Sequence, residues 1–442
     1  MRLTLPLLLS LLPAAAVIAL VEQPYQWFSA LGFVLQRRWP LGAAQPLPGV
    51  LVLAVPLLGT LLFLLLAWGP LARGRGGGLT GLLALQRPAE AGAGADPDPE
   101  ATARASLSPM VQLARLPLLA LTHLAGLSVG TESPSAALGA STLLALRRWL
   151  PPLAQLPLPL LLAIGGGAGL GAAFRSPILG LAYALEELST NGGPLLVLPT
   201  LLLAGLGTIL AGWIAPASLG QPARLVAPPG AALDTLVPPA LWPALLLTAV
   251  VMGLLGVLFV RLLVPCSALL GSWLRRHRWR SAAALALAFA LVAVLSGGFS
   301  LNDGSLALGP ALAGNPTALP WAGLPRLLGP LLSISFGAPG GLMHDTMTLG
   351  AVVVGPFVQG LPPEQRAAFA GVAAAAVFAG ACRTPLFCAV FVFTLQSQIT
   401  LVPWLLVASS VAAGLGELCG GPTWNEAQVE RQQAARRSAA PS

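Results

Sequence analysis

The chain has 442 residues, of which 56% are hydrophobic and only 9% are charged. This composition excludes a soluble globular domain and predicts an all-α polytopic membrane protein with roughly ten or more apolar segments. The net charge is +8, and all 23 basic residues are arginines. They suit cytoplasmic loops and anionic membrane lipid better than nucleic acid.

The first apolar segments follow in chain order. Residues 3–35 predict one long or broken membrane helix, retained rather than cleaved as a signal peptide, because the apolar run is long and prolines interrupt it. Residues 50–71 predict a second span. The glycine-rich stretch 73–81 comes next and includes Gly77 and Gly78. Its backbone could present N–H groups to an anion, although a flexible hinge explains it equally well.

The most polar internal stretch, 87–106, predicts a solvent-exposed loop. It holds several acids, but its prolines keep the chain extended and no histidine or cysteine joins them. The four cysteines of the chain lack metal-ligand spacing. The sequence therefore predicts neither a metal site nor a cofactor site. It also contains no nucleophile–base pair or nucleotide-binding loop that would indicate an enzyme.

The segment 130–140 places one carboxylate, that of Glu132, in a long apolar neighbourhood. Pro134 suits the first turn of a helix, so Glu132 is predicted at a helix N-terminus, where orphan N–H groups and the helix dipole favour an anion. Burying an ionisable group in hydrocarbon is costly, and this makes Glu132 a functional candidate. The alternative is an ordinary loop glutamate that caps a helix.

The remaining elements alternate apolar helices with short breaks. Residues 175–177 open a helix that ends at Glu186 and Glu187. The Gly/Pro-rich stretch 336–345 interrupts the pattern. Further apolar segments are predicted at 195–213, 241–270, 282–295, 346–358, 367–381, 385–395 and 401–418.

Two pairs of segments repeat in the same order. Residues 130–140 align with 341–351, and residues 171–177 align with 379–385, at offsets of 211 and 208 residues. Each half of the chain therefore contains an interrupted helix, a Gly/Ala-rich helix and an Arg-Ser/Thr-Pro helix start. Paired interrupted helices in two halves indicate a transporter whose substrate site lies where the broken helices meet.

At these residues the chain resembles the CLC family of chloride channels and chloride/proton antiporters. The family's Gly-Lys/Arg-Glu-Gly-Pro motif is similar to residues 130–134, and its Asn-Ala-Pro helix, which ends in a glutamate pair, is similar to 175–187. Its Gly-Gly-Ile/Phe-Phe-x-Pro motif resembles 340–345, and its second Arg-Ala-Pro helix start resembles 383–385. The motifs occur in the family's order over nearly the whole chain.

The resemblance implies a divergent, bacterial-type member that consists of the membrane core. Its fold would be of CLC type, with two inverted-topology repeats whose broken helices meet at a central anion pathway. Residues 1–422 would form this transport domain, in halves of about 1–215 and 216–422, and 423–442 a short polar cytoplasmic tail. The expected partners are chloride or another small anion, protons, membrane lipid and a second copy of the chain. The expected location is the bacterial inner (plasma) membrane.

The resemblance also assigns roles to residues. Glu132 is the external gate and proton carrier, which occupies an anion site when ionised and leaves it when protonated. Glu187 relays protons from the cytoplasmic side, the alternative being a solvated helix end. The matching motifs imply an anion site at Gly77, Gly78, Ser133, Gly341, Leu342, Met343 and Ile399.

Several departures from the family's pattern affect the anion site. The family's Gly-Ser-Gly-Ile-Pro motif is matched by 76–80, so Gly77 stands where the serine would be. The stretch 396–400, predicted to precede the last membrane helix, has no tyrosine, and the chain's two tyrosines, Tyr25 and Tyr183, are expected elsewhere. Both side-chain ligands would then be missing, and the backbone is expected to hold the anion.

The altered motif at 343–345 introduces two titratable residues, Asp345 and His344. Asp345 would repel an anion when ionised, unless it serves as a helix cap. His344 is expected to be a packed or solvent-facing imidazole. We therefore expect chloride/proton exchange, which the retained Glu187 favours. The alternatives are a passive chloride channel of the same fold and a degenerate, non-transporting membrane partner.

Overall fold

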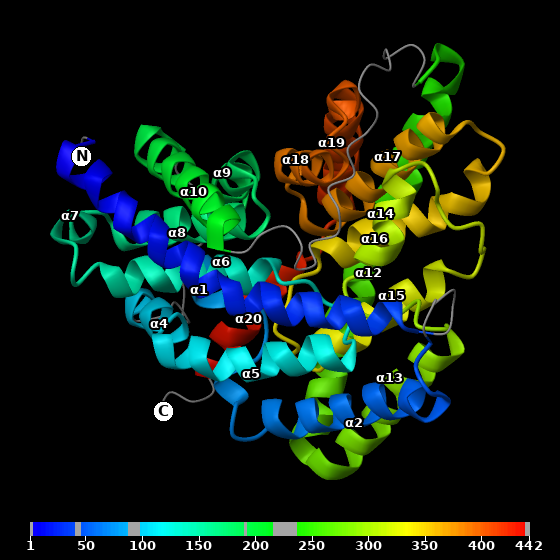
Figure 1. Cartoon of the computed structure of the whole chain (residues 1–442), viewed down its shortest axis with the longest axis horizontal. Helices are drawn as coiled ribbons and strands as arrows, with labels where there is room; N and C mark the ends of the chain where they lie inside the picture. Colours follow the sequence, from blue (N-terminus) through cyan, green and yellow to red (C-terminus); the bar gives the residue numbers. More distant parts are fainter. Residues whose placement is uncertain (1–2, 40–45, 87–97, 190–191, 215–236, 438–442) are drawn as a thin grey trace.

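The computed structural model describes residues 3–39, 46–86, 98–189, 192–214 and 237–437. In this part of the chain every extended regular element is a helix, which confirms the prediction of an all-α protein (Figure 1). Of the predicted loop, residues 87–97 lie outside the described residues, and its second part forms the short helix α4 (Pro99–Ser106). The side chain of Asp98 caps this helix by accepting a hydrogen bond from the backbone N–H of Ala101, at 2.9 Å.

The helices fall into two successive groups of similar order. The first group is α1 (Leu5–Arg37), α2 (Gly49–Ala67), α3 (Thr80–Gln86), α4, α5 (Pro109–Ala125), α6 (Glu132–Leu146), α7 (Pro151–Ala154), α8 (Leu158–Ala173), α9 (Pro177–Glu186) and α10 (Pro194–Ile214). The second group is α12 (Trp242–Arg276), α13 (Arg278–Leu295), α14 (Ser305–Leu312), α15 (Gly323–Ser335), α16 (Met343–Val354), α17 (Pro363–Cys382), α18 (Pro385–Gln396), α19 (Val402–Cys419) and α20 (Trp424–Arg437).

Seven helical segments of the described chain are long and apolar enough to cross a membrane. They are Leu5–Arg37, Gly49–Ala67, Pro194–Ile214, Pro239–Arg276, Arg278–Leu295, Pro363–Cys382 and Ile399–Ala434. Shorter apolar helices, among them α8, α9 and α18, complete the set. Large apolar side chains such as Trp213, Leu295 and Leu418 are more than four-fifths exposed, as expected of a surface that faces lipid. The chain is therefore an integral membrane protein.

Small residues let the central helices of each half pack closely. An added Cβ at Gly139 of α6 would lie 2.2 Å from the carbonyl oxygen of Gly165 in α8. An added Cβ at Gly350 of α16 would lie 2.3 Å from the carbonyl oxygen of Ala373 in α17. These positions are related by the same offsets, 211 and 208 residues, as the repeated sequence segments. The Gly/Ala-rich helices therefore allow the same close approach in both halves.

The polar segment after residue 422, predicted as a short polar tail, is helical. Residues 424–437 form α20, which returns to the middle of the molecule and packs against α3, α12 and α17 (Figure 1). This segment is therefore a helix packed against three others. Residues 438–442 lie outside the described part.

Candidate functional site

Gly130 and Gly341, which the sequence repeat pairs, lie side by side near the centre of the fold. They form an antiparallel bridge in which the N–H of Gly341 donates to the carbonyl oxygen of Gly130 over 3.1 Å. Two residues beyond each glycine a helix begins, α6 at Glu132 and α16 at Met343. The unpaired N–H groups of two helix starts therefore meet here, and their dipoles make this point favourable for negative charge.

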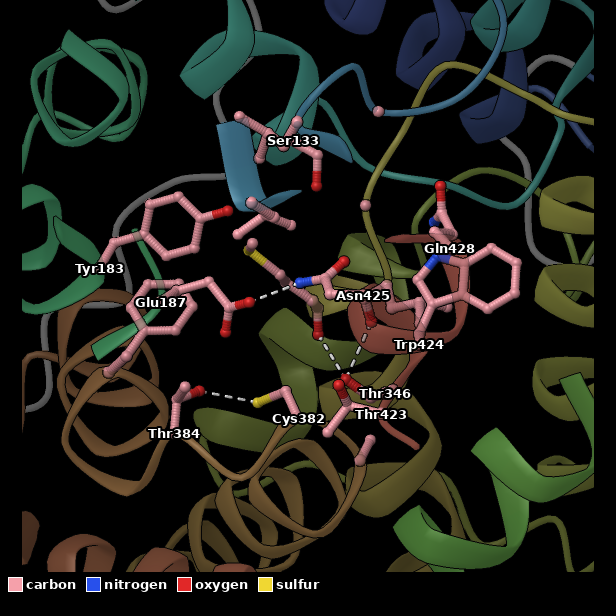
Figure 2. A pocket seen from close by; sticks show the side chains of 18 of the residues that line it. Ser133, Tyr183, Glu187, Thr346, Cys382, Thr384, Thr423, Trp424, Asn425 and Gln428 are labelled. Atoms are coloured by element: carbon pink, nitrogen blue, oxygen red, sulfur yellow. Dashed lines mark hydrogen bonds between the residues drawn. The ribbon is translucent and has the colours of Figure 1, made fainter. Parts of the chain in front are cut away.

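A cavity of about 60 Å³ lies beside this bridge (Figure 2). This is several times the minimum volume for one water molecule, so the cavity has room for a small ion. Its wall contains six of the seven residues predicted to bind an anion: Gly77, Gly78, Ser133, Gly341, Leu342 and Met343. Glu187 lines the same cavity. The structure thus brings the predicted anion residues together with the predicted proton acceptor.

Ile399 is the predicted residue that the structure does not bring to the cavity. It begins the turn Ile399–Leu401 and is 73% exposed. The stretch 396–400 precedes α19, the last apolar helix, as predicted, but the polar helix α20 follows α19. Four residues at the start of α20 line the cavity instead: Thr423, Trp424, Asn425 and Gln428 (Figure 2).

These four residues escaped sequence reasoning because α20 is polar and lacks an apolar run. A capping box would have identified the helix start. The backbone N–H of Thr423 donates to the carboxylate of Glu426 over 2.8 Å, and the N–H of Glu426 donates to Oγ1 of Thr423 over 3.3 Å. The Thr-x-x-Glu spacing is the sequence signature of this exchange.

Two hydroxyl groups of the cavity wall are candidate side-chain ligands, in addition to the backbone donors that the motifs predict. Tyr183, which we expected elsewhere, lines the cavity from α9. Ser133 lies against Gly77, where an added Cβ would come within 2.7 Å of the Ser133 Cβ and 3.3 Å of its Oγ. The space that a serine at position 77 would need is therefore already filled by a serine from α6.

The carboxylate of Glu132 lies beside the bridge, against Gly341, which lines the cavity; Glu132 itself is not a lining residue. Glu132 is fully buried, and its Oε2 lies 3.0 Å from the position of an added Cβ at Gly341. Its Oε1 accepts a hydrogen bond from the backbone N–H of His344 at 3.3 Å and also contacts Nδ1 of the His344 ring. His344 is the second residue of α16, so a carboxylate from one half occupies the anion-favouring end of a helix in the other half.

Asp345 is paired rather than acting as a helix cap. It is the third residue of α16, it is 1% exposed, and its Oδ1 accepts a hydrogen bond from Ser128 Oγ at 2.9 Å. The guanidinium of Arg326 lies 3.6 Å from the same oxygen, and Arg326 is fully buried. The expected repulsion of an anion by Asp345 is therefore offset, because Arg326 neutralises its charge.

Arg326 has a counterpart at the offset of 211 residues, namely Arg115 in α5. Both guanidiniums pack against a glycine of positive φ: an added Cβ would lie 2.3 Å from Arg115 at Gly78 and 2.5 Å from Arg326 at Gly304. Arg115 is 1% exposed and hydrogen-bonds Gln112 Oε1, but among the described residues it forms no ion pair with a carboxylate. Of these two arginines, Arg326 is paired with Asp345, whereas Arg115 keeps an uncompensated positive charge. This charge lies beneath Gly78, which lines the cavity.

The two glutamates that end α9 point to different partners. Both carboxylate oxygens of Glu186 accept backbone N–H groups from the first turn of α18, those of Leu386 at 3.0 Å and Phe387 at 2.7 Å. Glu187 is 6% exposed and accepts a hydrogen bond from Asn425 Nδ2 at 2.7 Å in the cavity wall (Figure 2). Glu186 therefore acts as a helix cap, and Glu187 is the member of the pair available to the cavity.

Comparison with known proteins agrees with this geometry. A family model described as "Voltage gated chloride channel" matches residues 76–417. The X-ray structure of a slow cyanobacterial Cl⁻/H⁺ antiporter superposes with a TM-score of 0.71 at 20% identity, over 98% of this chain and 99% of that one. The crystal structure of a CLC-type fluoride/proton antiporter gives 0.67 at 22% identity, over 94% and 95%.

A eukaryotic CLC transporter superposes with a TM-score of 0.68 at 20% identity, over 97% of this chain and 74% of that one. No curated protein sequence gives a significant match. At these identities the superpositions establish the fold of the chain and nothing finer.

Proposed function

Because the chain belongs to the CLC family of voltage-gated chloride channels, a transport family and not an enzyme family, we propose that it exchanges a small anion for protons across the membrane. The observation that carries this proposal is the contact between Glu132 and the first turn of α16. A buried carboxylate stands there in the position that a free anion would take. Anion and carboxylate would therefore compete for one set of donors.

The proposed cycle follows from the charge of that carboxylate. Ionised Glu132 holds its place beside His344 and Gly341 and excludes an anion by occupancy and by like charge. A protonated carboxyl loses most of its attraction to the helix start, so it leaves and an anion from the outer solution can take its place. Loss of that proton to the outer solution returns the carboxylate to the helix start, and the returning carboxylate displaces the anion inward to the cavity. Each cycle would thus link one direction of proton movement to the opposite movement of anions.

Glu187 is the proposed proton acceptor on the inner side. It shares the cavity with the anion donors and with the polar start of α20, where Asn425 orients its carboxylate. Protons would pass from Glu187 to Glu132 along the cavity, which needs water or a hydroxyl group between the two carboxylates. The polar residues of α20 favour the presence of such water.

Chloride is the proposed anion, and fluoride is the second candidate. Two of the structures that superpose on the chain are a cyanobacterial Cl⁻/H⁺ antiporter and a CLC-type fluoride/proton antiporter. Proteoliposomes that contain the purified protein would be loaded with chloride, fluoride or nitrate, and anion efflux and proton uptake would be recorded with electrodes. We expect chloride efflux with opposing proton movement. Anion efflux without protons would indicate a passive channel, and no flux of either would indicate a non-transporting protein.

A homodimer in the bacterial inner membrane, as the resemblance implies, is part of the proposal. The described residues of a single chain are sufficient to form the cavity, so each subunit would hold its own anion site. Chemical cross-linking of the purified protein in detergent and in liposomes would test this assembly, with a dimer band expected at both conditions.

A further inference from the structure

Tyr183 reaches the cavity with a hydroxyl group that has no protein partner. The residue is 1% exposed, and within the described chain its Oη forms no hydrogen bond. The ring packs on Phe387, with centroids 4.7 Å apart, and this contact fixes its direction. Figure 2 shows the hydroxyl directed into the space below Ser133. Buried hydroxyl groups are usually paired, and Tyr183 differs from the other unpaired hydroxyl groups of the described chain in that it lines the cavity, where an occupant can be its partner.

The polar neighbours of this hydroxyl are engaged elsewhere. Glu187, four residues further along the chain, accepts a hydrogen bond from Asn425 at the α20 side of the cavity. The hydroxyl of Thr346 donates to the carbonyl oxygens of Leu342 and Met343, both at 2.9 Å. The hydroxyl of Tyr183 is thus an unpaired donor in a wall where Glu187 and Thr346 are already engaged.

The other residues of the cavity wall favour a negatively charged occupant. Gly77 and Gly78 line the cavity together with Met343, the first residue of α16, where a helix start leaves N–H groups unpaired. The guanidinium of Arg115 lies beneath Gly78. A neutral hydroxyl donor completes such a set because it adds a hydrogen bond to an anion without adding charge.

We propose that the hydroxyl of Tyr183 is a direct side-chain ligand of the anion in this cavity. The proposal rests on the proposed function and names a residue of its binding site that motif comparison places elsewhere. The tyrosine ligand is supplied by the middle of α9, one helical turn before Glu187, instead of by the segment at 396–400. The proposed anion ligand Tyr183 and the proposed proton acceptor Glu187 are thereby four residues apart, on the same face of α9.

The first test measures chloride binding to the purified protein by titration calorimetry. Tyr183→Phe removes the hydroxyl and keeps the ring on Phe387. We expect the dissociation constant for chloride to rise about tenfold or more, since a hydrogen bond to a charged group is being removed. The control is Thr200→Val, because the Thr200 hydroxyl is also buried and also has no hydrogen-bond partner within the described chain, but Thr200 lies in α10 and does not line the cavity. Its variant should bind chloride like the wild type.

A second measurement, ¹⁹F NMR, detects the contact between Tyr183 and the anion directly. The chain contains two tyrosines, so biosynthetic 3-fluorotyrosine labelling gives two ¹⁹F resonances. The resonance that disappears in Tyr183→Phe should shift on titration with chloride, and the resonance of Tyr25 should not. Unchanged chloride affinity in Tyr183→Phe, together with an unshifted Tyr183 resonance, would overturn the proposal while wild-type flux still supported exchange. Wild-type protein that neither binds nor moves an anion would overturn the proposed function itself.

Discussion

His344 holds the carboxylate of Glu132 from the opposite half of the chain. Its backbone N–H and its ring nitrogen Nδ1 both face Oε1 of Glu132. The ring is fixed by stacking on Phe174, at a centroid distance of 5.5 Å, and by an edge contact with Phe391 at 5.2 Å. The residue is 3% exposed, so the contact is protected from water. The Glu132 carboxylate, the candidate gate, is therefore held by the His344 side chain, whose orientation is itself fixed by aromatic contacts.

Removing the His344 ring should loosen this gate. In His344→Leu the carboxylate of Glu132 keeps the helix start but loses the ring contact, so it should leave the anion position more often. We expect chloride efflux from proteoliposomes at neutral pH to rise several-fold. His123→Leu provides the control, because His123 is the other buried histidine of the described chain and donates no hydrogen bond to Glu132. Equal efflux in His344→Leu and wild type would contradict a holding role for the ring.

Ser133 fills the space beside Gly77, so we expect that the serine and the glycine at positions 133 and 77 can be swapped. Gly77→Ser alone brings a Cβ within 2.7 Å of the Ser133 Cβ, so we expect a lower unfolding temperature in detergent. Ser133→Gly alone removes the hydroxyl and should weaken chloride binding, by about tenfold if that hydroxyl contacts the anion.

The double variant Gly77→Ser/Ser133→Gly returns one hydroxyl to the same space without the clash. Stability and chloride affinity should both recover toward the wild-type values, as measured by thermal unfolding and titration calorimetry. A double variant that is no better than the worse single variant would show that the two positions do not share this space.

Substitution of the two glutamates at the end of α9 should have different effects on proton transport. Glu187→Gln keeps the size of the side chain and a hydrogen bond to Asn425, but it cannot carry a proton. We expect proton uptake by proteoliposomes to be lost while chloride efflux continues. Glu186→Gln should retain proton uptake and lower the unfolding temperature, because it weakens the cap on Leu386 and Phe387 of α18. Identical transport behaviour of the two variants would argue against a special role for Glu187.

The related arginines should respond differently to the loss of charge. Arg326→Gln leaves Asp345 buried without its cation, and breaking a buried pair costs about 3–5 kcal/mol, so we expect a clear drop in unfolding temperature. Arg115→Gln leaves no carboxylate behind, so it should be the milder change in stability but should weaken chloride binding. The comparison uses thermal unfolding and titration calorimetry on both variants. Wild-type chloride affinity in Arg115→Gln would exclude an electrostatic contribution from that charge.

The sequence predicts the architecture well because membrane burial and the internal repeat constrain it strongly. The break before Glu132 and the break before Met343 could be recognised from glycine, proline and a buried acid, and the offset of 211 residues paired them correctly. Gly77, Gly78 and Ser133 could be placed by motif because their local backbone is short and glycine-rich. These features depend on residues close together in the chain.

Contacts between distant polar side chains could not be predicted in the same way. Asp345 could be read as a cap or as a repelling charge, since its partner Arg326 is buried in another helix. The role of α20 was hidden because hydropathy recognises apolar helices, whereas this helix is polar and fits between three others. Tyr183 lies within an apolar helix whose facing direction only the packing of α9 against α18 determines.

The most direct test of the account records chloride efflux and proton uptake together in proteoliposomes of wild type and Glu132→Gln. Glutamine retains the shape of the side chain but neither ionises nor carries a proton, so it should bind the helix start of α16 less strongly than the carboxylate does. The account predicts proton uptake against chloride efflux in the wild type, and chloride efflux without proton uptake in Glu132→Gln. Proton uptake that remains coupled to chloride in Glu132→Gln would contradict the central claim that this carboxylate links the two ions.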